Sequence, residues 1–214
     1  MREQKDVLKA IDEVMLYGHS GMSGRITGWC SRDKAHALAT AVVEFRPEVT
    51  VELGVWGGAS LVPLAIAHDV LEHGHVYGVD PWTADAAIRG VQEVENLEWW
   101  GARDYEAIYR DCLQAVLDLR LTSRCTVIRA TSERAHSLFD EIDLLHVDGN
   151  HSEAASTLDV FLYLPKVRSG GHVFFDDVDW HSTENAVRLV EERCEKVTEI
   201  RSEPGGVCAV YRMR

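Results

Sequence analysis

The fold of this chain is set by one segment, Val51-Glu52-Leu53-Gly54-Val55-Trp56-Gly57-Gly58-Ala59-Ser60. A short apolar strand ends there in glycines, and a helical pattern begins directly afterwards. Glycine allows a backbone to approach a bound molecule closely, and a turn between a strand and a helix is where such molecules bind in this kind of sheet. The next predicted strand ends in Asp80, at the place where an acidic side chain accepts hydrogen bonds from ribose hydroxyls. Together they predict a cofactor-binding turn.

The rest of the chain alternates short β-branched runs with helical stretches. Strands separated by helices predict a mostly parallel, Rossmann-like doubly wound α/β sheet with helices on both faces. A Glu-Pro-Gly-Gly turn at 203–206 predicts a final hairpin, so the last strand should run antiparallel. The expected strands are Val49–Leu53, Val76–Val79, Cys125–Ala130, Ile142–Val147, His172–Phe175, Val197–Ser202 and Val207–Arg212, and the expected helices are 59–72, 104–119, 133–139, 153–163 and 184–195.

Residues 1–47 are expected to form a helical extension to a single domain at 48–214. Apolar residues recur at helical spacing over 3–17 and again over 32–45, with Gly18 as a stop signal and a glycine-rich loop at 19–31 between them. The amphipathic first helix either packs on the domain or makes a homo-oligomer contact. A chain of 214 residues is too short for two ordinary α/β domains.

Composition excludes several classes of partner. The chain has 22 basic and 35 acidic side chains, which give a net charge of −13. This negative charge repels nucleic acid and anionic membranes. The five cysteines are scattered without a C-x-x-C pair and are expected to be reduced thiols. The chain shows neither a secretory signal pattern nor an apolar run long enough to span a bilayer, so we expect a cytoplasmic protein.

The spacing of the glycine turn separates two kinds of nucleotide fold. It reads Gly54-x-x-Gly57-Gly58 rather than G-x-G-x-x-G, and Glu52 precedes it on the strand. With the terminal hairpin, this resembles the class I S-adenosylmethionine-dependent methyltransferases over about residues 48–212. The alternative is an NAD-dependent oxidoreductase or a non-catalytic cofactor-binding subunit. The resemblance implies S-adenosylmethionine as the cofactor, held by Glu52, Gly54, Gly57, Gly58, Ser60, Asp80, Thr131 and Ser132.

Three aspartates follow the fourth and fifth predicted strands. Asp148 ends one strand, and Asp176 and Asp177 end the next. Because parallel strands end at one edge of a sheet, we expect these carboxylates to converge there and to hold a divalent cation. An oxygen-rich set favours Mg²⁺, with Mn²⁺ or Ca²⁺ also suitable. The alternative is that the aspartates cap a helix and a turn.

The carboxylates narrow the resemblance to metal-dependent O-methyltransferases. Catechol-type and caffeoyl-CoA-type enzymes carry Asp-Asn where this chain has Asp176-Asp177, so the macrocin-type and cephalosporin hydroxylase-like proteins are more similar. The resemblance implies methyl transfer to a hydroxyl of a small molecule, a sugar or a phenol. His151 occupies the offset from Asp148 at which the first two families have a catalytic lysine, so we interpret His151 as the general base and His181 as its substitute.

Two aromatic features stay open at this point. Trp82 either stacks on the adenine or fills the core, and it is counted here among the cofactor-binding candidates. The segment 83–103 carries Trp99-Trp100 and is a substrate lid, an oligomer contact or part of the core.

Overall fold

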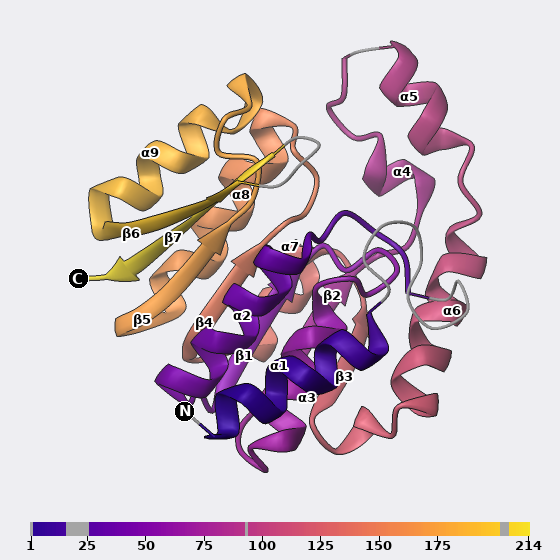
Figure 1. The fold of residues 1–214 in the computed structure, drawn as a ribbon. Helices are drawn as coiled ribbons and strands as arrows, with labels where there is room; N and C mark the ends of the chain where they lie inside the picture. Colours follow the sequence, from indigo (N-terminus) through magenta and orange to yellow (C-terminus); the bar gives the residue numbers. More distant parts are fainter. Residues whose placement is uncertain (1, 16–25, 93, 202–205) are drawn as a thin grey trace.

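The computed structural model describes residues 2–15, 26–92, 94–201 and 206–214. Its centre is a seven-stranded sheet in the order β3-β2-β1-β4-β5-β7-β6. Strands β1 to β5 are parallel, and β7 pairs antiparallel with both β5 and β6 (Figure 1). The strands are β1 (Val49–Leu53), β2 (His75–Asp80), β3 (Cys125–Arg129), β4 (Ile142–Val147), β5 (Val167–Phe175), β6 (Cys194–Arg201) and β7 (Val207–Met213).

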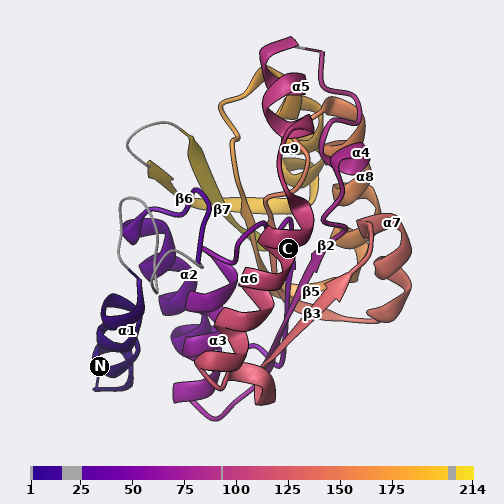
Figure 2. The same cartoon turned by 90° about the vertical axis from the view of Figure 1, so that its right-hand side faces the viewer.

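Helices cover both faces of the sheet and divide the core into two apolar clusters. One face is packed by α1 (Arg2–Val14), α2 (Arg32–Phe45), α3 (Leu61–Val70) and α6 (Tyr105–Asp118). The other is packed by α7 (Ser132–Ala135), α8 (Glu153–Tyr163) and α9 (Glu184–Arg193). Two further helices, α4 (Ala84–Ala87) and α5 (Val94–Gly101), extend beyond the sheet in both views (Figures 1 and 2).

The predicted doubly wound sheet with an antiparallel final strand is confirmed, with differences at element ends. The helix expected over 133–139 is only α7 followed by a 3-10 turn, His136–Leu138. Helix α9 stops at Arg193 because β6 already begins at Cys194, and β5 begins at Val167, well before the apolar run at its end. The predicted stop at Gly18 and most of the 203–206 turn lie outside the described residues.

The two N-terminal helices pack directly on the sheet domain. Val7 and Ile11 of α1 are fully buried in one cluster with Leu38 and Val42 of α2. Burial of such apolar side chains fixes α2 across the sheet face and brings its first turn to the carboxyl ends of the strands. None of the described helices is long and apolar enough to cross a membrane.

Candidate functional site

Strand pairing places the polar groups of the site on one face of the sheet. Glu52 of β1 and His146 of β4 are register partners, and both are fully buried. Because side chains alternate along a strand, Asp148 lies on the same side as His146. The backbone N–H of Asp148 donates to Leu53, and that of Asp176 donates to Val147, so both aspartates continue the strand pattern. This face is the one that α2 covers.

Lys34, in the first turn of α2, inserts its ammonium group between two of the predicted aspartates. The Ser31 hydroxyl caps α2 by accepting the backbone N–H of Lys34 at 3.1 Å. The side-chain Nζ then lies 2.8 Å from Asp148 Oδ2 and also contacts Asp176 Oδ2. Burial alone lowers the pKa of Lys34, but the charges of Asp148 and then Asp176 raise it well above its ordinary value. Lys34 therefore stays protonated and cannot serve as a base.

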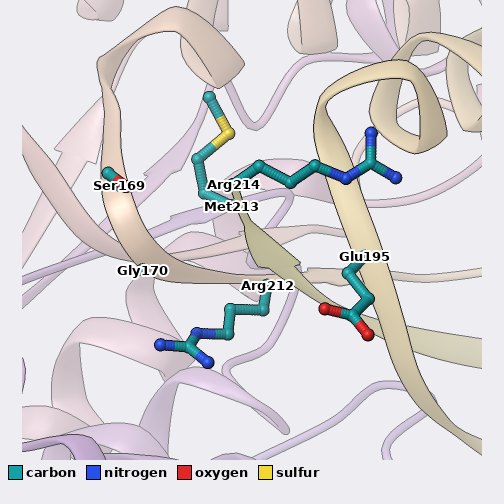
Figure 3. A pocket seen from close by; sticks show the side chains of 6 residues that line it. All are labelled: Ser169, Gly170, Glu195, Arg212, Met213 and Arg214. Carbon is teal, nitrogen blue, oxygen red and sulfur yellow. The ribbon is translucent and has the colours of Figure 1, made fainter.

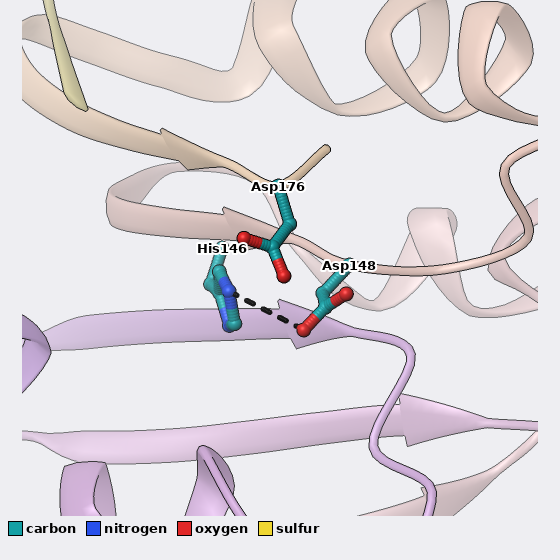
Figure 4. Close-up of side chains that lie close together, drawn as sticks. All are labelled: His146, Asp148 and Asp176. Carbon is teal, nitrogen blue, oxygen red and sulfur yellow. Dashed lines mark ion pairs between the residues drawn. The ribbon is translucent and has the colours of Figure 1, made fainter. Parts of the chain in front are cut away.

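His146 joins Asp148 and Asp176 in a group that could hold a metal ion. One ligand atom from each of the three lies within 4.8 Å of the others, and Figure 4 shows the ring and both carboxylates meeting at the ends of β4 and β5. His146 Nε2 lies 3.8 Å from Asp148 Oδ2, and Nδ1 lies 3.4 Å from Glu52 Oε2. Neither ring nitrogen has a hydrogen-bond partner among the described residues.

Asp177 faces the predicted base rather than the other two carboxylates. Its Oδ2 lies 2.9 Å from His151 Nε2, while Asp148 Oδ1 is 3.9 Å from the same nitrogen. Trp180 contacts the His151 ring edge to face at 5.1 Å. Burial lowers the pKa of His151, so the imidazole is neutral at pH 7. Burial, and then the charge of Asp176, raise the pKa of Asp177 to about 7.

The capping alternative does not describe Asp148. Ser152 is the N-cap residue of α8, and the side-chain oxygen of Asn150 accepts its backbone N–H at 2.8 Å. Asp148 instead pairs with Lys34. His181, the substitute base, is 94% exposed and pairs with Glu184 at 3.0 Å, so it faces solvent.

The glycine turn is built by close backbone packing. A Cβ on Gly54 would lie 2.0 Å from the Asp148 carbonyl oxygen, and one on Gly57 would lie 2.0 Å from Thr27 Oγ1. Gly58 has a φ of +84°, which disfavours any residue with a side chain. The glycines thus join the turn to the strand ends and to the segment before α2.

Glu52 and Ser60 shape this turn from within. The buried Ser60 hydroxyl donates to Glu52 Oε1 at 2.8 Å, so one side chain from β1 holds the start of α3. Both residues are buried, and their predicted contact with a cofactor stays a prediction.

Asp80 organises the turn from the end of β2. Its carboxylate accepts backbone N–H groups from Val55 and Trp56 at 3.0 Å each, and from Trp82 at 2.7 Å. An ionised carboxylate has about four acceptor positions, which leaves capacity for a ribose hydroxyl. Burial raises the pKa of Asp80, and these three hydrogen bonds oppose the shift.

Trp82 lies in the core. It is 1% exposed, packs against Tyr109, and donates its ring N–H to the carbonyl of Trp56 at 2.8 Å. Thr131 and Ser132 begin α7, where the Ser132 carbonyl accepts the Tyr163 hydroxyl at 3.0 Å. Both stand at the end of β3, which pairs with β2, the strand that ends in Asp80.

An aromatic cluster, defined by Trp29, Trp56, Trp99, Trp100 and Tyr105, covers the glycine turn. Trp56 lies at its centre, with ring centroids 5.3 to 6.0 Å from the other four. Trp56 also has a φ of +50°, a strained conformation for a large residue. The segment 83–103 therefore contacts the turn directly.

Asn150 ties the same segment to the end of β4. Its side-chain nitrogen lies within hydrogen-bond distance of three carbonyl oxygens, those of Ala86 at 2.9 Å, Ala87 at 3.0 Å and Arg89 at 3.0 Å, which share its two N–H groups. Since Asn150 stands beside His151, the segment is anchored at the predicted catalytic group.

A separate groove lies at the opposite edge of the sheet, at the start of β5 and the end of β7. Its volume is about 340 Å³, and Figure 3 shows the residues that line it. Its lining residues are Ser169, Gly170, Glu195, Arg212, Met213 and Arg214. It includes none of the predicted site residues.

Sequence reasoning missed three residues of this region. His146 had a detectable signal, because a histidine in an apolar strand two positions before Asp148 must share its face. Trp56 lay within the glycine turn itself. Lys34 had no signal, since its contact with Asp148 spans 114 residues.

The strand order, the glycine turn after β1 and the acidic residue ending β2 define the class I methyltransferase fold. A family model described as a methyltransferase domain matches residues 51–178, and the chain belongs to that family, whose methyl donor is S-adenosylmethionine. A comparison with curated proteins finds no match.

Solved structures share this fold at low sequence identity. The O-methyltransferase from Bacillus cereus in complex with SAH has a TM-score of 0.60 at 12% identity, over 99% of this chain and 91% of that one. Cofactor-bound Rv0187 from MTB has a TM-score of 0.62 at 13% identity, over 100% and 89%. SAH-bound Podospora anserina methyltransferase PaMTH1 has a TM-score of 0.60 at 11% identity, over 100% and 88%.

Proposed function

We propose that this methyltransferase transfers the methyl group of S-adenosylmethionine to a hydroxyl oxygen of a small molecule, a sugar or a phenol. The observation that carries the proposal is the pairing of His151 with Asp177 beside Asp148, at the strand ends that adjoin the glycine turn. A hydroxyl group must lose its proton as its oxygen attacks the sulfonium methyl. A positioned neutral histidine is suited to take it.

His151 is the general base of this proposal, and Asp177 is the residue that positions it. Above pH 7 the ionised Asp177 carboxylate accepts the Nε2 proton of His151, which leaves Nδ1 as the proton-accepting nitrogen. The O–H proton passes to that nitrogen as the new C–O bond forms. The bond between the methyl carbon and sulfur breaks with its electron pair going to sulfur, which yields neutral S-adenosylhomocysteine.

The aromatic cluster is proposed to border the acceptor site. Trp29 is 63% exposed and Trp99 is 38% exposed, so the cluster offers open ring surface next to the turn. Aromatic faces pack well against sugar and phenol rings. Asn150 connects the 83–103 segment to the residue next to His151. In this proposal the segment acts as a lid over the acceptor site, and its position depends on that contact.

We also propose that a divalent cation assists the reaction. Two of the three predicted carboxylates, Asp148 and Asp176, fit this role together with His146, because their ligand atoms converge. A bound divalent ion supplies a Lewis acid that stabilises charge on an acceptor oxygen. Asp177, the third predicted ligand, contributes through His151 in this structure.

The test is a methyl-transfer assay on a panel of phenols and sugars, with release of S-adenosylhomocysteine as the readout. Calorimetry with S-adenosylhomocysteine and with NAD gives an independent measure, and we expect heat only with the first. Transfer that survives complete chelation would remove the metal from the proposal. Transfer confined to amine acceptors would overturn the hydroxyl assignment while leaving the cofactor in place.

A further inference from the structure

The carboxylate pair at the end of β4 and β5 already holds a cation, the ammonium group of Lys34. That side chain is 1% exposed, and the side chains of Asp148 and Asp176 are 20% and 13% exposed. Removing one partner from such a buried ion pair leaves an uncompensated charge at high cost. Lys34 therefore supplies the positive charge that compensates this buried carboxylate pair.

His146 shows that an ammonium group alone does not complete the site. Glu52 Oε2 lies 3.4 Å from Nδ1, and it lacks a hydrogen-bond partner among the described residues. If Nδ1 carries the ring proton toward Glu52, then Nε2 presents a lone pair to Asp148 Oδ2 at 3.8 Å. An ion bound between Nε2 and Asp148 Oδ2 would give this buried ring nitrogen the partner that it lacks among the described residues.

The arrangement of Glu52 behind His146 fits a metal site. A histidine ligand usually donates its other ring N–H to a carboxylate, which fixes its tautomer and orientation. Here the pairing of β1 with β4 fixes Glu52 beside His146, so the ring would be oriented before an ion arrives. A nitrogen donor beside two carboxylates favours transition ions such as Mn²⁺ over Mg²⁺, which prefers oxygen alone.

Lys34 and such an ion cannot occupy the pair together. Both are cations, and both would bind the carboxylates of Asp148 and Asp176, which Lys34 contacts through their Oδ2 atoms. Exchange of the two cations would require the Lys34 ammonium group, which is carried on a flexible four-carbon stem, to leave the pair while α2 stays in place. Ser31 and the buried apolar face of α2 hold the helix independently of the ammonium group.

We infer that Lys34 and a divalent transition ion are alternative occupants of a site formed by His146, Asp148 and Asp176. The inference rests on the metal-assisted part of the proposed function. It makes Lys34 the residue that sets metal affinity and His146 the residue that sets the preference for Mn²⁺ over Mg²⁺.

Titrations of Mn²⁺ and Mg²⁺, followed by calorimetry and by the Mn²⁺ electron paramagnetic resonance signal, test the inference. We expect Lys34→Met to bind Mn²⁺ roughly tenfold or more tightly than the wild type. Adding His146→Phe to that variant should weaken Mn²⁺ binding roughly tenfold or more and change Mg²⁺ affinity little. Lys9→Met is the matched control, since Lys9 is exposed on α1 and pairs only with Glu13 in the described contacts.

Each outcome of the test is decisive. Equal Mn²⁺ affinity in Lys34→Met and the wild type would overturn the competition. If Lys34→Met is unfolded without metal, recovery of its folded circular dichroism signal on adding Mn²⁺ supports the inference, and failure to recover overturns it. S-adenosylhomocysteine binding is measured in parallel, because its absence in the wild type would count against the proposed function rather than against this site.

Discussion

Asp159 gives a prediction about stability whose size and sign follow from the structure. It lies on α8 with 6% exposure, its carboxylate accepts a hydrogen bond from the Ser132 side chain, and its Oδ2 lies just beneath Gly149. Burial raises its pKa from 3.8 to about 7. The folded state therefore holds a proton that the unfolded chain releases at lower pH. Stability from this group is present below the unfolded pKa and decreases as pH rises from about 4 to 7.

The magnitude follows from the shift of about three pKa units. At about 1.4 kcal/mol for each unit, ionised Asp159 costs up to about 4 kcal/mol of folding free energy above pH 7. Between pH 5.5 and 8 the loss is about 2 kcal/mol. Asp159→Asn keeps an oxygen for Ser132 and carries no charge. The free energy of unfolding of this variant, relative to the wild type, should therefore rise by the same amount between pH 5.5 and 8. For a chain of this length, the gain corresponds to roughly 4 to 8 °C in Tm.

The assay is urea unfolding of the wild type and Asp159→Asn between pH 5.5 and 8.5. Only the difference between the two proteins is used, because it cancels the titration of every other group. Asp140→Asn, at an exposed carboxylate, is the control and should show a difference that does not vary with pH. A pH-independent difference for Asp159→Asn as well would refute the reasoning.

Three further predictions concern the site. His151→Ala should lower turnover by about 10² to 10⁴ with S-adenosylhomocysteine affinity unchanged, and it should remove the acidic limb of the pH–rate profile; near-normal turnover with the same limb would move the base elsewhere. Gly57→Val should abolish S-adenosylhomocysteine binding in calorimetry, because its side chain meets Thr27, and unchanged affinity in a folded variant would contradict the role of the turn. Asn150→Ala should release the 83–103 segment, raising KM for the acceptor and increasing amide hydrogen exchange over 84–89; unchanged exchange there would mean that the segment is held by other contacts.

The sequence alone determined the succession of strands and helices along the chain and the edge of the sheet at which the site lies. Apolar strands alternating with helices specify a parallel sheet, and parallel strands bring Asp148 and Asp176 to one edge wherever the helices pack. The glycine turn and Asp80 were readable for the same reason, since each depends on its position at a strand end. These are local patterns, and local patterns fix local geometry.

Only the tertiary structure decided which partner each side chain meets. Lys34 reaches Asp148 because apolar burial lays α2 across the sheet, a packing that no pattern near Lys34 or Asp148 records. Asp177 turns toward His151 rather than toward Asp176, and Trp82 enters the core instead of presenting an open face. A strand end fixes where a backbone stops, but the direction of its side chain depends on charges and surfaces that distant segments bring to it.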